Sequence, residues 1–336
     1  MPLRSPYDHV SSIAKKTYPA FRYDGQADFA TWQNVARDTL ADLLCFDAFE
    51  PCEDNFTVEF QTEHENFTEI RFLFNSEEDF VVPCHILLPK KVKAPFVPVI
   101  CIQGHSTGMH ISLGRAKYPG DESTISGGDR DFAIRAAREG CAAITIEQRY
   151  MGEQGGSPNG TGCYSAALIT SLYGRTAIGE RVWDVMRLID VLEAHFDCLD
   201  MEHLVCLGNS GGGTTTFYSA CMDERIYCAV PSCAVCTYKD SIAGMHHCCC
   251  NYVPRIGEYF DMGDLAGLIA PRHLVVVNGK TDPIFPQNGV DETMEIAREV
   301  FAAANAPENL TNVTGPEGHR FYADLAWPVI HKYLGK

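Results

Sequence analysis

Basic side chains are scarce in this chain. Its 336 residues include 27 Lys and Arg against 44 Asp and Glu, which gives a formal net charge of −17. Proteins that bind nucleic acids neutralise phosphates with clustered Lys and Arg, and attraction to anionic membranes needs a similar excess. We therefore expect neither nucleic acid nor a membrane as a partner.

Long apolar segments are missing as well. No run approaches the roughly 18–20 uninterrupted apolar residues of a membrane-spanning helix. The first nine residues, Met1 to His9, lack the hydrophobic centre of a secretory signal peptide. These features predict a cytoplasmic protein. In a reducing cytosol the 15 cysteines are expected to be free thiols rather than a disulfide framework.

A complete metal-binding pattern is not visible either. Cys233 and Cys236 form one C-x-x-C pair, and two histidines and three cysteines follow at 246–250. Zinc accepts such ligands, but a second C-x-x-C is missing and adjacent residues rarely point to one centre. We predict no metal and no cofactor, and we interpret this cluster as a loop packed beside a pocket.

The glycine-rich stretch at 208–213 lacks the Gly-Lys-Ser/Thr and G-x-G-x-x-G signatures of nucleotide sites. It follows an apolar run at 204–207 and reads Gly208-Asn209-Ser210-Gly211-Gly212, a G-x-S-x-G nucleophile elbow. The strand must reverse sharply into a helix, and a Cβ two residues before or after the serine would collide there. The pattern predicts that Ser210 is a nucleophile in a strained backbone conformation.

A serine nucleophile needs a base that is itself oriented by a carboxylate. Asp282 follows the apolar, β-branched run 273–278, and His319 lies in a glycine-flanked loop after the strand-like run 310–314. The order Ser, Asp, His is that of the α/β-hydrolases. We therefore predict a catalytic triad of Ser210, Asp282 and His319.

Backbone N–H groups must also stabilise the oxyanion that forms during attack. One donor is expected from Gly211, which follows the nucleophile. The strand-like run 96–102 leads into Gln103-Gly104-His105-Ser106, a variant of the His-Gly loop of esterases. We assign the second donor to the N–H of His105, with that of Ser106 as the alternative.

The remaining pattern alternates strands and helices. An amphipathic helix is expected at 26–44, three alternating strands at 57–63, 68–75 and 80–88, and strand–helix repeats from residue 97 onward. Asp129 is expected to cap a helix that runs to Arg138. This indicates an α/β fold with a mostly parallel central sheet, helices on both faces and an N-terminal helical extension. We divide the chain into an extension at 1–55 and a catalytic domain at 56–336.

Three long irregular stretches, 106–128, 149–177 and 237–268, follow or lie among the carboxyl ends of strands, where ligands bind in such sheets. They are expected to form pocket walls or a small lid. Arg149 is the first candidate for substrate contact, because its guanidinium can grip a carboxylate. The other candidates are Ser106, Tyr150, Glu153, Trp183 and Tyr252.

The chain resembles the α/β-hydrolase superfamily, and within it the acetyl xylan esterase-like branch that is related to dienelactone hydrolases. The resemblance covers about residues 30–335. It is carried by the elbow and by the stretches at 99–105, 174–179, 181–187, 238–242, 247–254 and 282–286.

This resemblance implies a serine esterase that hydrolyses small acyl esters, with acetylated carbohydrates first among its substrates. A lactone or uronate-ester hydrolase with the same triad is an alternative, and Arg149 would suit the uronate. A binding protein that keeps the fold without catalysis is the contrasting class. The oligomeric state stays open, and a homo-oligomer is compatible with the N-terminal extension.

Overall fold

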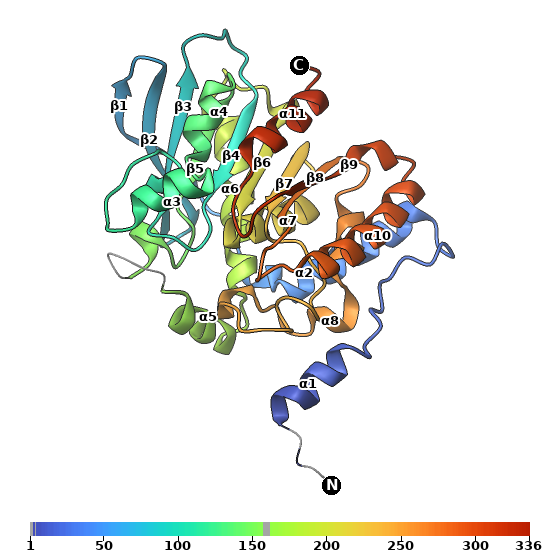
Figure 1. The fold of residues 1–336 in the computed structure, drawn as a ribbon. Helices are drawn as coiled ribbons and strands as arrows, with labels where there is room; N and C mark the ends of the chain where they lie inside the picture. Colours follow the sequence, from blue (N-terminus) through green and yellow to red (C-terminus); the bar gives the residue numbers. More distant parts are fainter. Residues whose placement is uncertain (1–2, 4, 157–161) are drawn as a thin grey trace.

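A nine-stranded sheet forms the centre of the molecule in the computed structural model, which describes residue 3, residues 5–156 and residues 162–336 (Figure 1). The strand order is β1-β2-β3-β5-β4-β6-β7-β8-β9. The pairs β1–β2, β2–β3 and β3–β5 are antiparallel. The pairs β5–β4, β4–β6, β6–β7, β7–β8 and β8–β9 are parallel. The strands are β1 (Thr57–Glu63), β2 (Phe67–Glu77), β3 (Phe80–Pro89), β4 (Pro98–Ile102), β5 (Ala142–Ile146), β6 (Val205–Asn209), β7 (Cys228–Ser232), β8 (His273–Gly279) and β9 (Leu310–Gly315).

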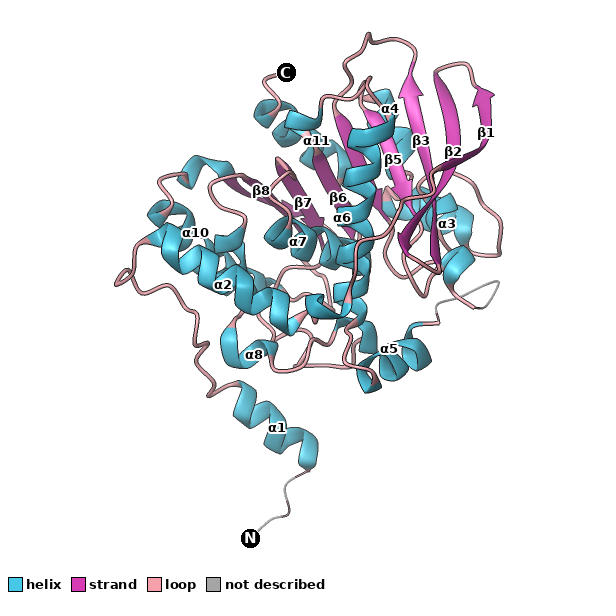
Figure 2. Cartoon of the chain, turned by 180° about the vertical axis from the view of Figure 1, so that it is seen from behind, coloured by secondary structure: helices cyan, strands magenta, loops and turns pink. Residues whose placement is uncertain are grey.

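Helices cover both faces of this sheet (Figures 1 and 2). Buried residues of α4 and α11 pack on one face, and those of α2, α6, α7 and α10 pack on the other. The helices are α1 (Pro6–Ala14), α2 (Phe29–Leu43), α3 (Asp121–Gly128), α4 (Phe132–Arg138), α5 (Cys163–Leu172), α6 (Ala177–His195), α7 (Gly211–Met222), α8 (Ile256–Tyr259), α9 (Met262–Leu265), α10 (Gln287–Ala303) and α11 (Ala323–Tyr333).

The two cores follow from the alternation of side chains along the buried strands. In β4, Ile100 and Ile102 belong to the larger core, whereas Val99 and Cys101 belong to the smaller one. Successive side chains of a strand point to opposite faces, so a strand that is apolar at every position must be covered on both sides. All five residues of β4 are buried.

The expected α/β fold, with a mostly parallel central sheet and helices on both faces, is confirmed, and most strands lie within two residues of their predicted bounds. The prediction for Asp129 is wrong. This residue has a positive φ of 49° and ends α3, while Asp131 precedes α4. The stretches interpreted as irregular contain α3, α5, α8 and α9, short helices whose pattern is too brief to be recognised.

The N-terminal region has two different parts. Helix α1 has no buried residue and projects from the body at the bottom of Figure 1. Helix α2 packs into the larger core through Trp32, Ala36 and Leu40, and Trp32 Nε1 donates a hydrogen bond to the Phe21 carbonyl at 3.1 Å. The division of the chain at residue 55 stays a prediction.

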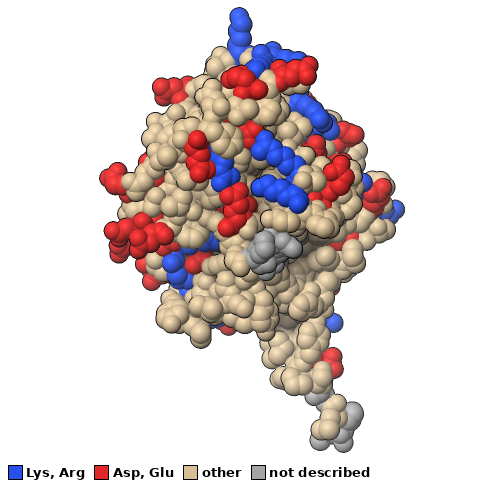
Figure 3. All heavy atoms as spheres, turned by 90° about the vertical axis from the view of Figure 1, so that its left-hand side faces the viewer, with Lys and Arg blue, Asp and Glu red and all other residues tan. Residues whose placement is uncertain are grey.

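Charged side chains of both signs are interspersed over the upper part of the face in Figure 3, while its lower part carries few of them. Helix α5 exposes Tyr164, Leu168, Ile169 and Leu172, and Tyr173 directly after the helix is exposed as well. Among the described residues, no helix combines the length and the apolar character that crossing a membrane requires.

Candidate active site

Ser210 occupies the turn between β6 and α7. Its backbone has a φ of 57° and a ψ of −125°, a conformation that is costly for a residue with a Cβ. Two hydrogen bonds hold the turn: Ser210 N–H donates to the Ser232 carbonyl at 2.8 Å, and Thr214 N–H donates to the Ser210 carbonyl at 2.8 Å. The strain and the strand-to-helix position are those of a nucleophile elbow.

The flanking glycines are required by close packing of the backbone. A Cβ on Gly208 would lie 2.5 Å from the Gly212 carbonyl oxygen, and a Cβ on Gly212 would overlap the Ile102 carbonyl oxygen. Both obstacles are backbone atoms, which cannot move aside as a flexible side chain can. The elbow is therefore fixed by contacts of β6 with α7 and with the end of β4.

Gly212→Ala is expected to lower the free energy of unfolding by about 1–3 kcal/mol, because overpacking a dense core forces the backbone to shift. Urea denaturation followed by circular dichroism measures the change. Gly257→Ala in α8 is the matched control, since a Cβ there meets no atom within 4 Å. Equal stability of the two variants would contradict the packing argument.

The Asp282–His319 pair lies at the carboxyl ends of β8 and β9. His319 Nδ1 is 2.8 Å from Asp282 Oδ2. Asp282 Oδ1 accepts hydrogen bonds from the N–H groups of Ile284 at 2.8 Å and Phe285 at 3.2 Å. The carboxylate is buried, and the Phe285 ring stacks on the imidazole with centroids 5.9 Å apart. These contacts fix the orientation of the imidazole.

The electrostatics of the pair suit a histidine base. Burial alone would raise the pKa of Asp282, but the hydrogen bond and charge of His319 lower it overall. An ionised aspartate beside Nδ1 favours the tautomer with its proton on Nδ1, which leaves Nε2 free to accept a proton. Cys233 lies beside this pair, and burial raises the pKa of its thiol to about 12.

The loop after β4 packs directly against the elbow. A Cβ on Gly104 would overlap the Asn209 carbonyl oxygen and lie 2.9 Å from Ser210 Cβ. The His105 ring lies against Gly211, where an added Cβ would be 2.9 Å from both Nδ1 and Cε1 of the ring. The two residues predicted to supply oxyanion donors, His105 and Gly211, are therefore adjacent in space.

Arg149 is not available as a free group for a substrate carboxylate. Its side chain is 5% exposed and forms a two-pronged ion pair with Asp184 at 2.7 and 2.8 Å. Glu77 lies 2.6 Å and Glu180 3.7 Å from the same guanidinium. These carboxylates raise the pKa of Arg149 although burial opposes them. The guanidinium therefore already has three acidic partners, and substrate contact by Arg149 stays a prediction.

The other contact candidates have structural partners. Trp183 donates to the Ser76 carbonyl at 2.8 Å and stacks on Phe49. Ser106 accepts a weak hydrogen bond from Gly108 N–H at 3.4 Å. The others bond as follows: Tyr150 with Thr170, Glu153 with Arg71, and Tyr252 with the Ile242 carbonyl. A role of Ser106, Trp183 or Tyr252 in substrate binding stays a prediction.

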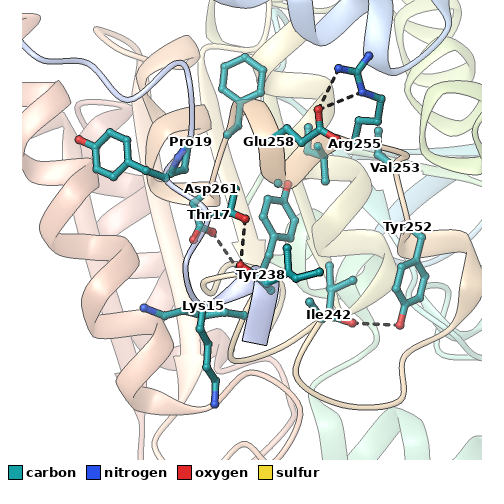
Figure 4. Close-up of a pocket in the computed structure, with 18 of the residues that line it drawn as sticks. Lys15, Thr17, Pro19, Tyr238, Ile242, Tyr252, Val253, Arg255, Glu258 and Asp261 are labelled. Atoms are coloured by element: carbon teal, nitrogen blue, oxygen red, sulfur yellow. Dashed lines mark hydrogen bonds and ion pairs between the residues drawn. The ribbon is translucent and has the colours of Figure 1, made fainter. Parts of the chain in front are cut away.

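A cavity of about 500 Å³ lies between the N-terminal segment and residues 238–261 (Figure 4). Its lining includes Tyr238, Ile242 and Tyr252 but neither Ser210 nor His319. The cavity is therefore separate from Ser210 and His319, and Tyr252, which is 47% exposed, contributes to its wall.

Glu147 directly follows β5 and holds the loops beside the site together. It was not identified as a candidate from the sequence. Its carboxyl group accepts hydrogen bonds from the N–H groups of Met109 at 3.0 Å and Glu153 at 3.2 Å. A Cβ on Gly152 would overlap this carboxyl group. Burial raises the pKa of Glu147 to about 8, although the two backbone donors oppose the shift.

This raised pKa predicts a pH-dependent contribution to stability. The protonated carboxyl favours the folded state, so its contribution is complete below the unfolded pKa of about 4.3 and is lost as the pH rises through the folded value. Glu147→Gln removes the titration. We expect the difference in melting temperature, Glu147→Gln minus wild type, to increase as the pH rises from 4.5 to 8. The substitution Glu65→Gln, at an exposed position, is the control. Parallel curves would contradict the assignment.

Comparisons with known proteins agree with the fold. The sequence profile of the Abhydrolase family matches residues 4–317. The chain is 24% identical over 271 residues to YtaP of Bacillus subtilis strain 168, a protein named as a hydrolase, and this alignment covers 78% of the chain and 86% of YtaP.

Two solved structures share the fold over nearly the whole chain. One is a Bacteroides fragilis protein described as an acetyl xylan esterase, with a TM-score of 0.82, 16% identity and coverage of 98% of this chain and 95% of the other. The second is a glucuronoyl esterase from Solibacter usitatus, with a TM-score of 0.71, 14% identity and coverage of 95% and 97%.

Proposed function

The chain belongs to the α/β-hydrolase family, and we propose that it is a serine esterase that hydrolyses small acyl esters, acetyl esters of carbohydrates in particular. The observation that carries the proposal is the oriented Asp282–His319 pair, 2.8 Å apart, at the same sheet edge as a strained serine elbow. Parallel strands bring their carboxyl ends to one edge, where such folds hold their ligands.

The proposed reaction has two stages. Ser210 Oγ attacks the ester carbonyl and gives its proton to His319 Nε2, while the N–H groups of Gly211 and His105 stabilise the oxyanion. The C–O bond to the alcohol then breaks, and His319 protonates the leaving alcohol. In the second stage His319 takes a proton from water, the hydroxide attacks the acyl-enzyme, and the acid leaves as Ser210 recovers its proton.

Support for a small acyl group comes from the surroundings of the elbow. The His105 ring and the Met151 methyl group both lie next to Gly211, and the Phe285 ring covers one side of His319. Side chains packed so close to the nucleophile favour a short acyl chain over a long one. The resemblance to acetyl xylan esterases, and the structural neighbour described as one, favour a sugar acetate as the substrate.

The uronate-ester alternative gains support from the structural likeness to a glucuronoyl esterase. The cation that would have suited it is Arg149, and this residue is surrounded by Asp184, Glu77 and Glu180. The guanidinium that would suit a uronate is thus already paired with carboxylates, and small acyl esters remain the first proposal.

Hydrolysis of p-nitrophenyl esters from acetate to octanoate tests the acyl preference, and release of acetate from acetylated xylo-oligosaccharides tests the alcohol. We expect fast turnover of the acetate ester, a steep decline with chain length, and acetate release from the sugar. A methyl glucuronate ester hydrolysed faster than every acetate would replace the proposal by the uronate alternative. Folded protein that neither turns over an ester nor reacts with a fluorophosphonate would favour a silent binding protein.

A further inference from the structure

Four potential metal ligands converge beside the elbow from separate parts of the chain. They are His105 in the loop after β4, Cys163 at the first turn of α5, and Cys248 and Cys250 in the 237–268 stretch. One ligand atom from each lies within 4.8 Å of all the others. We refer to these four residues as the His–Cys cluster.

The spacing within the His–Cys cluster fits a tetrahedral ion. Zinc–sulfur bonds of about 2.3 Å and zinc–nitrogen bonds of about 2.0 Å place tetrahedral ligand atoms about 3.5–3.8 Å apart. The structure has His105 Nε2 3.2 Å from Cys250 Sγ, and Cys250 Sγ 3.3 Å from Cys248 Sγ. Shifts of a few tenths of an ångström would bring these two pairs to the separations expected between ligands of one zinc ion, and all other pairs of ligand atoms lie within 4.8 Å.

The buried guanidinium of Arg181 beside the His–Cys cluster indicates that some of its cysteines are thiolates. Arg181 is 1% exposed, and it donates to Cys250 Sγ at 3.2 Å and to Cys163 Sγ at 3.4 Å. Its remaining hydrogen bonds go to the Arg149 carbonyl, and it forms no ion pair with a carboxylate within the described part of the chain. A buried guanidinium needs a compensating negative charge, which thiolates would provide.

Charge balance then selects the kind of ion. Three thiolates and one neutral imidazole around a divalent cation leave one negative charge, and Arg181 neutralises it. Thiolate and imidazole ligands in a tetrahedral set favour zinc over magnesium or calcium, which take oxygen ligands. Apolar neighbours pack against the cysteines, among them Met151, Ala167 and Ala177. Cys163 and Cys250 are buried, whereas His105 and Cys248 are partly exposed, and such a hydrophobic surround limits the access of water to a metal site.

We propose that His105, Cys163, Cys248 and Cys250 bind one structural zinc ion. The ion would join the loop after β4 to the start of α5 and to the loop at 248–250, three segments that lie around the elbow. This ligand set does not include the C-x-x-C pair Cys233 and Cys236 that was considered in the sequence analysis. Cys233 lies beside Asp282 and His319 instead. The proposal does not depend on which ester the protein hydrolyses.

Metal analysis of the full-length protein tests the proposal. Protein purified without chelator is expected to contain about one zinc ion per chain, as a four-ligand structural site does. Cys248→Ser should remove at least nine-tenths of it. Cys249→Ser is the matched control, because its sulfur bonds to the carbonyls of Cys163 and Tyr164 and lies outside the His–Cys cluster; it should keep its zinc.

Reconstitution with cobalt gives a second readout that does not depend on activity or on the stability of a variant. The wild-type apoprotein with cobalt(II) should show the intense thiolate charge-transfer and d–d bands of a tetrahedral site, and added zinc should abolish them. Metal-free protein with no cobalt bands would overturn the proposal. So would an intact mass, measured without reductant, that shows a disulfide between these cysteines.

Discussion

Ser210→Ala is expected to lower kcat on p-nitrophenyl acetate by at least about 10⁴-fold, because the proposed acyl-enzyme forms on Ser210 Oγ, which the substitution removes. The fold should survive, since alanine adopts the strained turn about as well as serine and the hydrogen bonds that hold the turn come from the backbone. Stopped-flow or steady-state release of p-nitrophenol gives the rate, and circular dichroism confirms folding.

The exposed Ser126 in α3 provides the control for this substitution. Ser126→Ala should keep wild-type kcat and wild-type melting temperature. A Ser210→Ala variant that retains more than about a tenth of the wild-type rate would mean that hydrolysis does not proceed through Ser210, because loss of a true nucleophile costs orders of magnitude more.

Asp282→Asn is expected to lower kcat by about 10⁴-fold with little change in stability. An asparagine oxygen can still accept the hydrogen bonds from Ile284 and Phe285. Its amide group then faces His319 Nδ1 as a donor, which favours the tautomer with the proton on Nε2. That nitrogen can no longer accept the proton of Ser210. Steady-state kinetics on p-nitrophenyl acetate, at a pH where wild type is fully active, measure the loss.

Asp197→Asn, an exposed carboxylate at the end of the α6 region, is the matched control and should leave kcat unchanged. A loss smaller than about tenfold for Asp282→Asn would contradict the triad, because an orienting carboxylate that matters so little is not the partner of the catalytic base.

The elbow turn and the approach of Asp282 to His319 could be predicted because their signals are local. Gly208 and Gly212 reveal a tight strand-to-helix turn in five consecutive residues, and the structure places the backbone of Ile102 and Gly212 where a Cβ would need to be. Asp282 and His319 each follow a strand, and parallel strands end at one edge. Distance in sequence was therefore no obstacle to predicting their approach, which the 2.8 Å contact confirms.

The partners of Arg149 could not be predicted in the same way. The arginine follows a strand end, as a substrate-binding residue would, but its environment depends on Glu77 from β2 and on Glu180 and Asp184 from α6. No spacing rule links these segments. The convergence of His105 and Cys163 with Cys248 and Cys250 could not be predicted for the same reason, because three segments far apart in the sequence must meet. Helix α11 was not predicted from the sequence, because Pro328 within it is atypical of a helix.

The most direct test of the proposed mechanism is to trap the acyl-enzyme. Wild-type protein is mixed with p-nitrophenyl acetate, quenched with acid within the first turnovers, digested and analysed by mass spectrometry. We expect one acetyl group on the peptide that contains Ser210, and none on that peptide in Ser210→Ala. Turnover with no acetyl group on Ser210, or with the acetyl group on another residue, would contradict the proposed mechanism.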